Sequence, residues 1–141
     1  MEEKYLAPTQ IAGRDFMMRQ ITGNIVMLNL LRFREYAAYS ETPELAPKEP
    51  ISGEMAYQLY INHTLPHLEK SGGEILFKGK GGNFLIGPAT ERWDSVLLIR
   101  QQSTESFIAF AQDKDYLKGI GHRTAALEDS RLLPLTEDTI K

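Results

Sequence analysis

Two segments of this chain are apolar on both faces over the length of a β-strand: residues 26–31 read VMLNLL and residues 96–99 read VLLI. A strand with one solvated face alternates apolar and polar residues. These runs therefore predict strands with a cover on each side of their sheet. The strands are predicted over residues 24–33 and 93–100.

Three capping residues mark the predicted helices. Thr9, Ser52 and Ser103 each precede apolar residues at helical spacing, and such a side chain accepts hydrogen bonds from free N–H groups of the first turn. The first helix is predicted over 10–20, and the second from Ser52 to the Gly72–Gly73 pair. A third helix ends at 113–115, and a further one is predicted over 117–128. The apolar stripe of the second helix consists of Met55, Ala56, Leu59, Tyr60, His63 and Leu68.

Short apolar segments and turn residues complete the pattern. Strands are predicted over 74–78, 84–87 and 131–135, with the glycine-rich segment 79–83 as a hairpin turn and the proline-rich segment 40–50 as a surface loop. The order of elements predicts an α+β, ferredoxin-like sandwich, with an antiparallel sheet and helices on one face. Residues 24–141 are expected to form this single domain, and residues 1–23 an N-terminal helical extension.

Helices on one face leave the other face of the sheet open, although the strands are apolar on both sides. A second identical sheet, related by a two-fold axis, would cover that face. Burying on the order of 800 Å² per partner is enough for a stable dimer. The sequence therefore predicts a homodimer of the dimeric α/β-barrel type.

Composition and charge narrow the classes of partner. Hydrophobic residues at 42% and charged residues at 25% of 141 residues are typical of soluble globular proteins. A net charge of −3 offers no basic face for nucleic acid. The absence of cysteine excludes disulfides, thiolate nucleophiles and thiolate zinc sites. No run approaches the roughly 20 apolar residues of a membrane span, and MEEKYLAPTQ has no signal-peptide core, so we expect a cytoplasmic protein without a membrane partner.

Several short motifs together resemble a known family. They are the run 26–33, Tyr57, Tyr60, Gly72–Gly73, Trp93–Asp94, Ser103 with Phe107, Asp113 with Tyr116, and His122–Arg123. Over about residues 24–133 this pattern resembles domain-of-unknown-function family 1330, which belongs to the dimeric α/β-barrel superfamily. The resemblance implies the same ferredoxin-like dimer. It leaves function open, because the superfamily includes small monooxygenases, muconolactone-isomerase-like enzymes and ligand-binding modules.

Two histidines have the spacing of metal ligands. His63 and His67 lie four positions apart on a predicted helix, which can present two imidazoles to one ion. A metal site needs a third protein ligand, and Pro66 disturbs the helical register between them. We therefore expect no metal site, with His63 in the buried stripe and His67 in solvent.

Arg123, beside His122, is the candidate charge anchor of a ligand site. A guanidinium at the mouth of a cavity can bind a carboxylate or phosphate through two hydrogen bonds. The alternative is a structural ion pair with Asp113, Asp115 or Glu128.

Asn29 lies in the middle of an apolar strand, where an unpaired amide would cost about 1–3 kcal/mol. It must be paired, either with neighbouring backbone or the partner chain, or with a ligand that it orients. Tyr60 and Trp93 have the amphipathic rings that line small-molecule pockets, although such rings also fill cores.

Three functions stay open. The first is binding of a small organic acid or similar ligand, without any cofactor, in a small apolar cavity between sheet and helices. Its candidate residues are Arg123, His122, Asn29, Tyr60, His63 and Trp93. The second, implied by the resemblance, is a cofactor-independent monooxygenase-like or isomerase-like enzyme with His63 or His122 as acid or base. The third is a structural or partner-binding domain whose cavity is filled by its own side chains.

Overall fold

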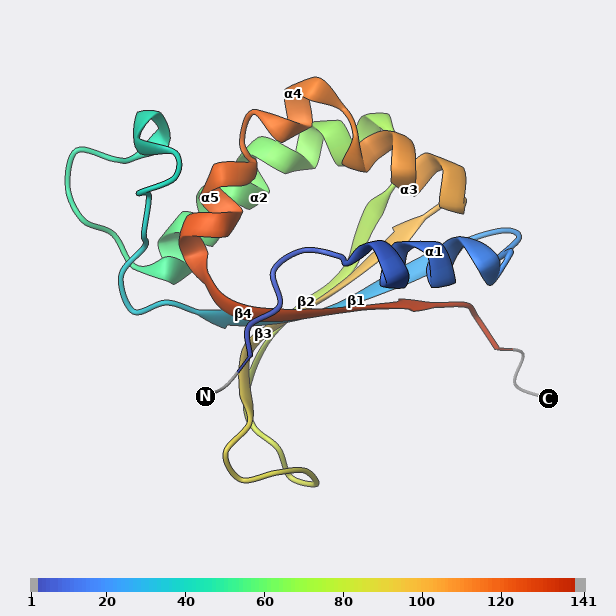
Figure 1. Cartoon of the computed structure of the whole chain (residues 1–141), viewed down its shortest axis with the longest axis horizontal. Coiled ribbons are helices and arrows are strands. Elements are labelled where there is room, and N and C mark those ends of the chain that lie inside the picture. The colour runs from blue at the N-terminus through green and yellow to red at the C-terminus, as the bar shows by residue number, and fades with distance from the viewer. Residues whose placement is uncertain (1–2, 139–141) are drawn as a thin grey trace.

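The computed structural model describes residues 3–138, which form a four-stranded antiparallel sheet with helices on one face (Figure 1). The strands are β1 (Ile25–Phe33), β2 (Glu74–Asn83), β3 (Arg92–Gln101) and β4 (Leu127–Leu135), in the order β2-β3-β1-β4. The helices are α1 (Gln10–Met18), α2 (Gly53–Lys70), α3 (Thr104–Ala111), α4 (Lys114–Leu117) and α5 (Ile120–Ala126), with a short 3₁₀ helix η1 (Pro43–Leu45). From β1 onward this is the strand, helix, strand, strand, helix, strand order of the ferredoxin-like fold. The predicted α+β fold class is confirmed.

The covered face of the sheet forms the core together with α2 and α5. The β1 residues Ile25, Met27 and Leu31 are buried, as alternation along a strand predicts. Residues of β3, the helices and the start of β4 pack against them. This core cluster consists of Leu31, Ala56, Tyr57, Tyr60, Leu97, Tyr116, Ala126 and Leu127.

The opposite face, which we call the open face, is apolar in its middle and carries charged side chains toward its ends, where Arg131 lies opposite Leu30 and Arg100 opposite Val26. It presents Val26, Leu28, Leu30, Phe77, Val96, Leu98, Leu133 and Leu135, which are cross-strand neighbours. The members on β1 are half-buried, while Phe77 and Leu133 are each 53% exposed. No labelled helix of residues 3–138 lies on this side of the sheet (Figure 1). Apolar side chains therefore line both faces, and the described chain covers only one.

β2 and β3 continue beyond the rest of the sheet as a long hairpin. The predicted turn over 79–83 and the predicted strand over 84–87 are both wrong, because β2 runs through the glycines to Asn83, which pairs with Arg92. A Cβ atom at Gly81 would lie 2.4 Å from the carbonyl oxygen of Trp93. Gly81 therefore allows the backbones of the two strands to approach closely, and it is not part of a turn.

The buried side of α2 differs from the predicted stripe. Met55 is 57% exposed and Leu59 is 38% exposed, whereas Tyr57 and Thr64 are buried. The helix runs through Pro66 without interruption, and α4 and α5 pack beside it. Because α2 meets helices as well as the sheet, its buried side is not the single stripe that amphipathic spacing predicts.

The predicted helix over 117–128 is too long at its C-terminal end. The structure has α4 and α5 in this region, and β4 begins at Leu127. Leu127 pairs with Phe33 across an irregularity in the register, and Asp129 pairs with Arg32. Leu127 and Asp129 are 0% exposed, so strand pairing and burial override the helical pattern here. The predicted edge strand at 131–135 is the second half of β4.

Helix α1 begins at the predicted cap. The Thr9 side chain accepts a hydrogen bond from the N–H of Ala12 at 3.1 Å. The helix buries none of its residues, and its Phe16 ring meets the Phe107 ring edge-on with centroids 6.1 Å apart. Neither α1 nor any other helix within residues 3–138 combines the length and apolar character needed to cross a membrane.

Candidate functional site

Arg123 projects from α5 to a group of neutral partners. Its guanidinium donates to the carbonyl oxygen of Leu6 at 2.7 Å and to Oγ of Ser130 at 3.4 Å. Its positive charge also acts on the hydroxyl of the buried Tyr57. Arg123 itself is half-buried, and none of these three neighbours carries a charge.

The carboxylates considered as ion-pair partners of Arg123 have other partners. Glu128 pairs with Lys4 at 2.9 Å, and Asp115 pairs with Lys118 at 3.1 Å. Asp113 caps α4 through the N–H groups of Asp115 and Tyr116. Among residues 3–138, no ion pair within 4.0 Å includes Arg123, so the structural ion pair is not formed.

Three tyrosines lie beside Arg123 in the core. The rings of Tyr57 and Tyr60 have centroids 5.2 Å apart, and the hydroxyls of Tyr60 and Tyr116 form a 2.6 Å hydrogen bond. Burial raises the pKa of Tyr57 and of Tyr116 far above the ordinary value of 10.0, and the positive charge of Arg123 opposes that shift in both. The hydroxyls of Tyr57 and Tyr116 therefore stay protonated.

The buried hydroxyl pair gives a stability prediction. Tyr60→Phe should lower the free energy of unfolding by about 1–3 kcal/mol, because it leaves the hydroxyl of Tyr116 buried without its partner. The double variant Tyr60→Phe/Tyr116→Phe should cost less than the sum of the two single changes, since both polar groups are gone. Urea unfolding of the four proteins in this cycle measures the coupling. Additive costs would mean that the two hydroxyls do not depend on each other.

Asn29 faces the covered side of the sheet. It lies opposite Leu97 on β3 and Leu132 on β4, and it is half-buried. Its side-chain N–H₂ donates to the carbonyl oxygen of Met27 at 3.2 Å. The expected hydrogen bond to neighbouring backbone is therefore confirmed.

His122 and Arg123 have different partners, although the two are adjacent in sequence. Its Nδ1 lies 2.8 Å from the hydroxyl of Tyr39, and the two rings meet edge-on. Burial lowers the pKa of His122 from 6.5, and the nearby His63 lowers it further. The imidazole is therefore neutral at pH 7.

His63 is held by backbone carbonyls. Its Nε2 lies 2.8 Å from the oxygen of Asp115 and 3.1 Å from that of Tyr116, so this nitrogen carries a proton that it donates. The ring of His67 is stacked at a tilt, 5.1 Å away. Within the part of the chain that the structure describes, no group of three His, Cys, Asp or Glu residues could hold a metal ion.

Trp93 belongs to a different cluster. Its ring lies 5.5 Å from the guanidinium of Arg32 and 4.9 Å from that of Arg131, and Arg131 stacks also on Tyr5 at 4.8 Å. The fully buried Asp129 accepts hydrogen bonds from both arginines, at 3.3 Å and 2.8 Å. The structure thus places Trp93 among these charged side chains, which are not among the contacts of Arg123.

An N-terminal segment that sequence reasoning missed reaches both clusters. The N–H of Tyr5 donates to Asp129 at 2.8 Å, across a separation of 124 positions, and Oγ of Ser130 donates to the carbonyl oxygen of Tyr5 at 2.5 Å. The next residue, Leu6, supplies the acceptor of Arg123. These are backbone contacts over long sequence distances, which leave no periodicity or spacing to detect.

A surface hollow of about 270 Å³ lies beside Tyr39. Its other lining residues come from the loop before α2: Ala37, Ala46, Pro47, Lys48, Glu49, Pro50 and Ile51. The hydrogen bond between Tyr39 and His122 places the histidine next to this hollow.

Comparison with solved structures places the chain in a family. A crystal structure of the RPA0582 protein of Rhodopseudomonas palustris, a protein of unknown function, is 33% identical to this chain, covers 98% of it and 100% of its own length, and superposes with a TM-score of 0.85. This chain belongs to the family of RPA0582. The structure of methylated RPA0582 agrees, at 33% identity, with 96% of each chain covered and a TM-score of 0.85.

More distant structures are described as ferredoxin-like. A protein of unknown function from Jannaschia sp. CCS1, described as dimeric, is 14% identical over 82% of this chain and 100% of its own, with a TM-score of 0.47. A DABB family protein from Mesorhizobium loti is 7% identical over 84% of this chain and 100% of its own, with a TM-score of 0.45. No protein-family model and no curated protein matches the chain. The resemblance to family 1330 therefore stays a prediction.

Proposed function

We propose that this member of the RPA0582 family binds a small organic acid at Arg123. One observation carries the proposal: a half-buried guanidinium whose hydrogen-bond partners among residues 3–138 are a carbonyl and a hydroxyl, both neutral. Taking a charge out of water is costly without a counter-ion. A carboxylate brought by a ligand would supply that charge.

The neighbours of Arg123 favour a flat acid. A carboxylate forms charge-assisted hydrogen bonds with a guanidinium, roughly twice as strong as those to a neutral acceptor. It can therefore replace the carbonyl oxygen of Leu6 at the same nitrogen. The rings of Tyr57 and Tyr60 lie nearby in the core at 4% and 9% exposure, so a planar ligand would contact them only after it displaced the segment of Leu6. Asn29, on the same side of the sheet, would add a polar contact.

A thermal-shift titration with benzoate tests this site. The wild-type melting temperature should rise with benzoate concentration, because a ligand that binds only the folded state stabilises it. Arg123→Gln should lose this ligand-dependent rise. Arg19→Gln is the matched control, since Arg19 is an arginine that donates to a backbone carbonyl, that of Pro134, on the protein surface. Equal melting-temperature responses of Arg123→Gln and wild type to benzoate would contradict the assignment of Arg123 as the residue that binds the carboxylate.

We infer that the protein works as a homodimer joined through the open face. The apolar side chains of that face lie on all four strands, and no labelled helix within the described residues covers them (Figure 1). A second sheet packed on it would bury them in the manner of a β-sandwich. Ligand binding at Arg123 would then take place on the other face, between sheet and helices, in each copy.

The contact between His122 and Tyr39 favours an enzyme as the second candidate. A neutral imidazole hydrogen-bonded to a phenol can accept a proton, and both groups lie beside the hollow at residues 46–51. An enzyme of this kind would lose turnover in His122→Gln while keeping its affinity for benzoate at Arg123. If the protein only binds its ligand, His122→Gln and wild type should behave alike in both turnover and benzoate affinity.

A further inference from the structure

The β2–β3 hairpin projects from the sheet as an arm. β1 pairs with β3 only as far as Ser95, opposite Leu31, whereas β2 and β3 pair onward to Asn83 and Arg92. We call residues 80–95 the hairpin arm. It leaves the sheet on the side away from the helices (Figure 1), which is the side of the open face.

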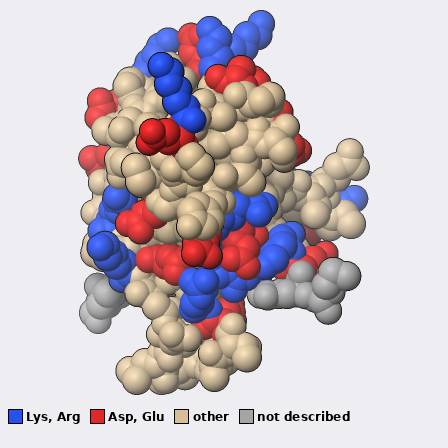
Figure 2. Space-filling model, turned by 90° about the vertical axis from the view of Figure 1, so that its left-hand side faces the viewer, with Lys and Arg blue, Asp and Glu red and all other residues tan. Residues whose placement is uncertain are grey.

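The tip of the arm is apolar and exposed. Leu85 is 99% exposed, Ile86 is 92% exposed and Phe84 is 43% exposed. Residues 84–90 contain no charged side chain. Figure 2 shows this tip as an uncharged projection below a band of Lys, Arg, Asp and Glu side chains. Consecutive apolar side chains held in water on a protruding loop mark a contact surface.

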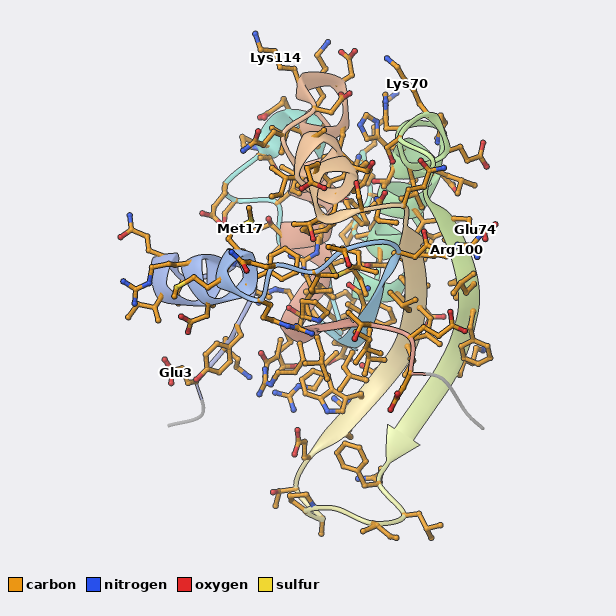
Figure 3. All side chains as sticks on the ribbon, turned by 90° about the vertical axis from the view of Figure 1, so that its right-hand side faces the viewer. Glu3, Met17, Lys70, Glu74, Arg100 and Lys114 are labelled. Atoms are coloured by element: carbon orange, nitrogen blue, oxygen red, sulfur yellow. The ribbon has the colours of Figure 1, made fainter. Side chains whose placement is uncertain are left out.

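The base of the arm has a fixed direction. Trp93 is 3% exposed and lies against the guanidinium groups of Arg32 and Arg131, which hold the first residues of β3 to the sheet. The far ends of the two strands are joined by the ion pair of Glu74 and Arg100 (Figure 3). The tip is therefore presented on a paired and anchored ribbon.

The length of the arm matches a second sheet packed on the open face. Strands rise about 3.3 Å per residue, so the paired segment from Lys80 to Asn83 extends about 10 Å before the loop 84–91 begins. Packed sheets lie about 10 Å apart. In such a dimer the tip would therefore extend as far as the partner's sheet and lie beside the edge of that sheet.

The arms would enlarge an interface on the open face. Four strands at about 4.8 Å spacing and about 23 Å of paired length give a face of about 400 Å² in plan. Stable interfaces bury about 800 Å² of accessible surface on each partner. The two exposed arms of a two-fold dimer would add contact area beyond the edge of the two sheets.

We propose that the hairpin arm is a clasp that grips a second copy of this chain, with Leu85 and Ile86 buried against the partner. The proposal rests on the inferred homodimer and is independent of the ligand site at Arg123. The two-fold axis gives each copy one arm and one receiving surface.

Sedimentation velocity of Leu85→Ser/Ile86→Ser against wild type tests the clasp. Four buried apolar side chains per dimer are lost, so the dimer dissociation constant should rise at least about 10,000-fold. Met17→Ser/Met18→Ser is the matched control, because these residues are 50% and 70% exposed on α1, outside the arm. It should dimerise as wild type does. Circular dichroism confirms that each variant is folded.

A second measurement tests the clasp without the double variant. The chain has no cysteine, so Leu85→Cys can carry a single polarity-sensitive fluorophore. Its emission should shift to the blue as protein concentration rises through the dimer dissociation constant.

The following outcomes would each contradict the proposal that the arm is a clasp. If the tip variant and wild type dimerise equally, or if the α1 control is weakened as much as the tip variant, the arm does not grip the second copy, although the sheet-to-sheet dimer stands. A wild type that stays monomeric refutes both the dimer and the clasp. Binding of wild type to phosphatidylcholine vesicles that is lost in the tip variant, with an unchanged dimer, assigns the tip to a lipid surface instead.

Discussion

Asp129→Asn is expected to lower the free energy of unfolding by about 3–5 kcal/mol, the cost of removing one partner from a buried ionic network. The Asp129 carboxylate is fully buried and accepts from Arg32, Arg131 and the backbone N–H groups of Tyr5 and Ser130. An amide removes the negative charge and turns one acceptor into a donor that faces other donors. Urea denaturation of variant and wild type measures the loss.

Asp115→Asn is the matched control, because Asp115 pairs with Lys118 at the surface with 67% of its side chain exposed. Its cost should be below about 1 kcal/mol. Equal losses in the two variants would mean that the buried network at Asp129 is no stronger than a surface pair.

The same network predicts how stability depends on pH. Burial by itself raises the pKa of Asp129, but the hydrogen bonds from Tyr5, Arg131 and Ser130 outweigh it and hold that pKa below the ordinary 3.8. A carboxyl with a depressed folded pKa contributes stability above its unfolded pKa and loses it as the pH falls through the folded pKa. Wild type should therefore lose stability on acidification below about pH 4, and Asp129→Asn should show a shallower loss.

Gly53→Ala is expected to cost about 3 kcal/mol or more, at the upper end of the penalties for overpacking. A Cβ atom at Gly53 would lie 2.3 Å and 2.5 Å from the carbonyl oxygens of Arg34 and Ala126, and 2.7 Å from the nitrogen of Arg34. All three are backbone atoms, so a side-chain rotation cannot relieve the contact. The N–H of Gly53 also donates to the oxygen of Arg34, which fixes the start of α2 against the end of β1.

Gly13→Ala provides the control for Gly53→Ala. Gly13 lies inside α1, and a Cβ atom there would meet nothing within 4 Å, so alanine should raise the stability by about 0.5–1 kcal/mol through helix propensity alone. Thermal and urea unfolding report both changes. A mild effect of Gly53→Ala would show that α2 can shift away from Arg34 and Ala126 without loss of packing.

Local chemistry explains which parts of the fold can be predicted from the sequence. The apolar pattern of β1 and the side chains of Thr9, Ser52 and Ser103 act within a few residues, and the structure has the strand and all three caps. The order of these elements is then sufficient for the fold class.

The predictions fail where distant contacts decide the outcome. Gly81 supports a strand because Trp93 approaches it from across the hairpin, and Leu127 begins a strand because β1 pairs with it. Residue type alone marks Arg123 as a candidate anchor. Its carbonyl partner at Leu6 could not be predicted, because a backbone acceptor 117 positions away leaves no trace in composition or spacing.

Isothermal titration of benzoate and its neutral isostere benzamide, against wild type and Arg123→Gln, tests the proposed ligand site most directly. If Arg123 recognises a carboxylate, wild type should bind benzoate at least about tenfold more tightly than benzamide, since a hydrogen bond to a charged group is worth about 1.5–3 kcal/mol. Arg123→Gln should bind the two compounds alike. Equal affinity of wild type for acid and amide, or an unchanged preference in Arg123→Gln, would contradict the assignment of Arg123 as the anchor of a small organic acid.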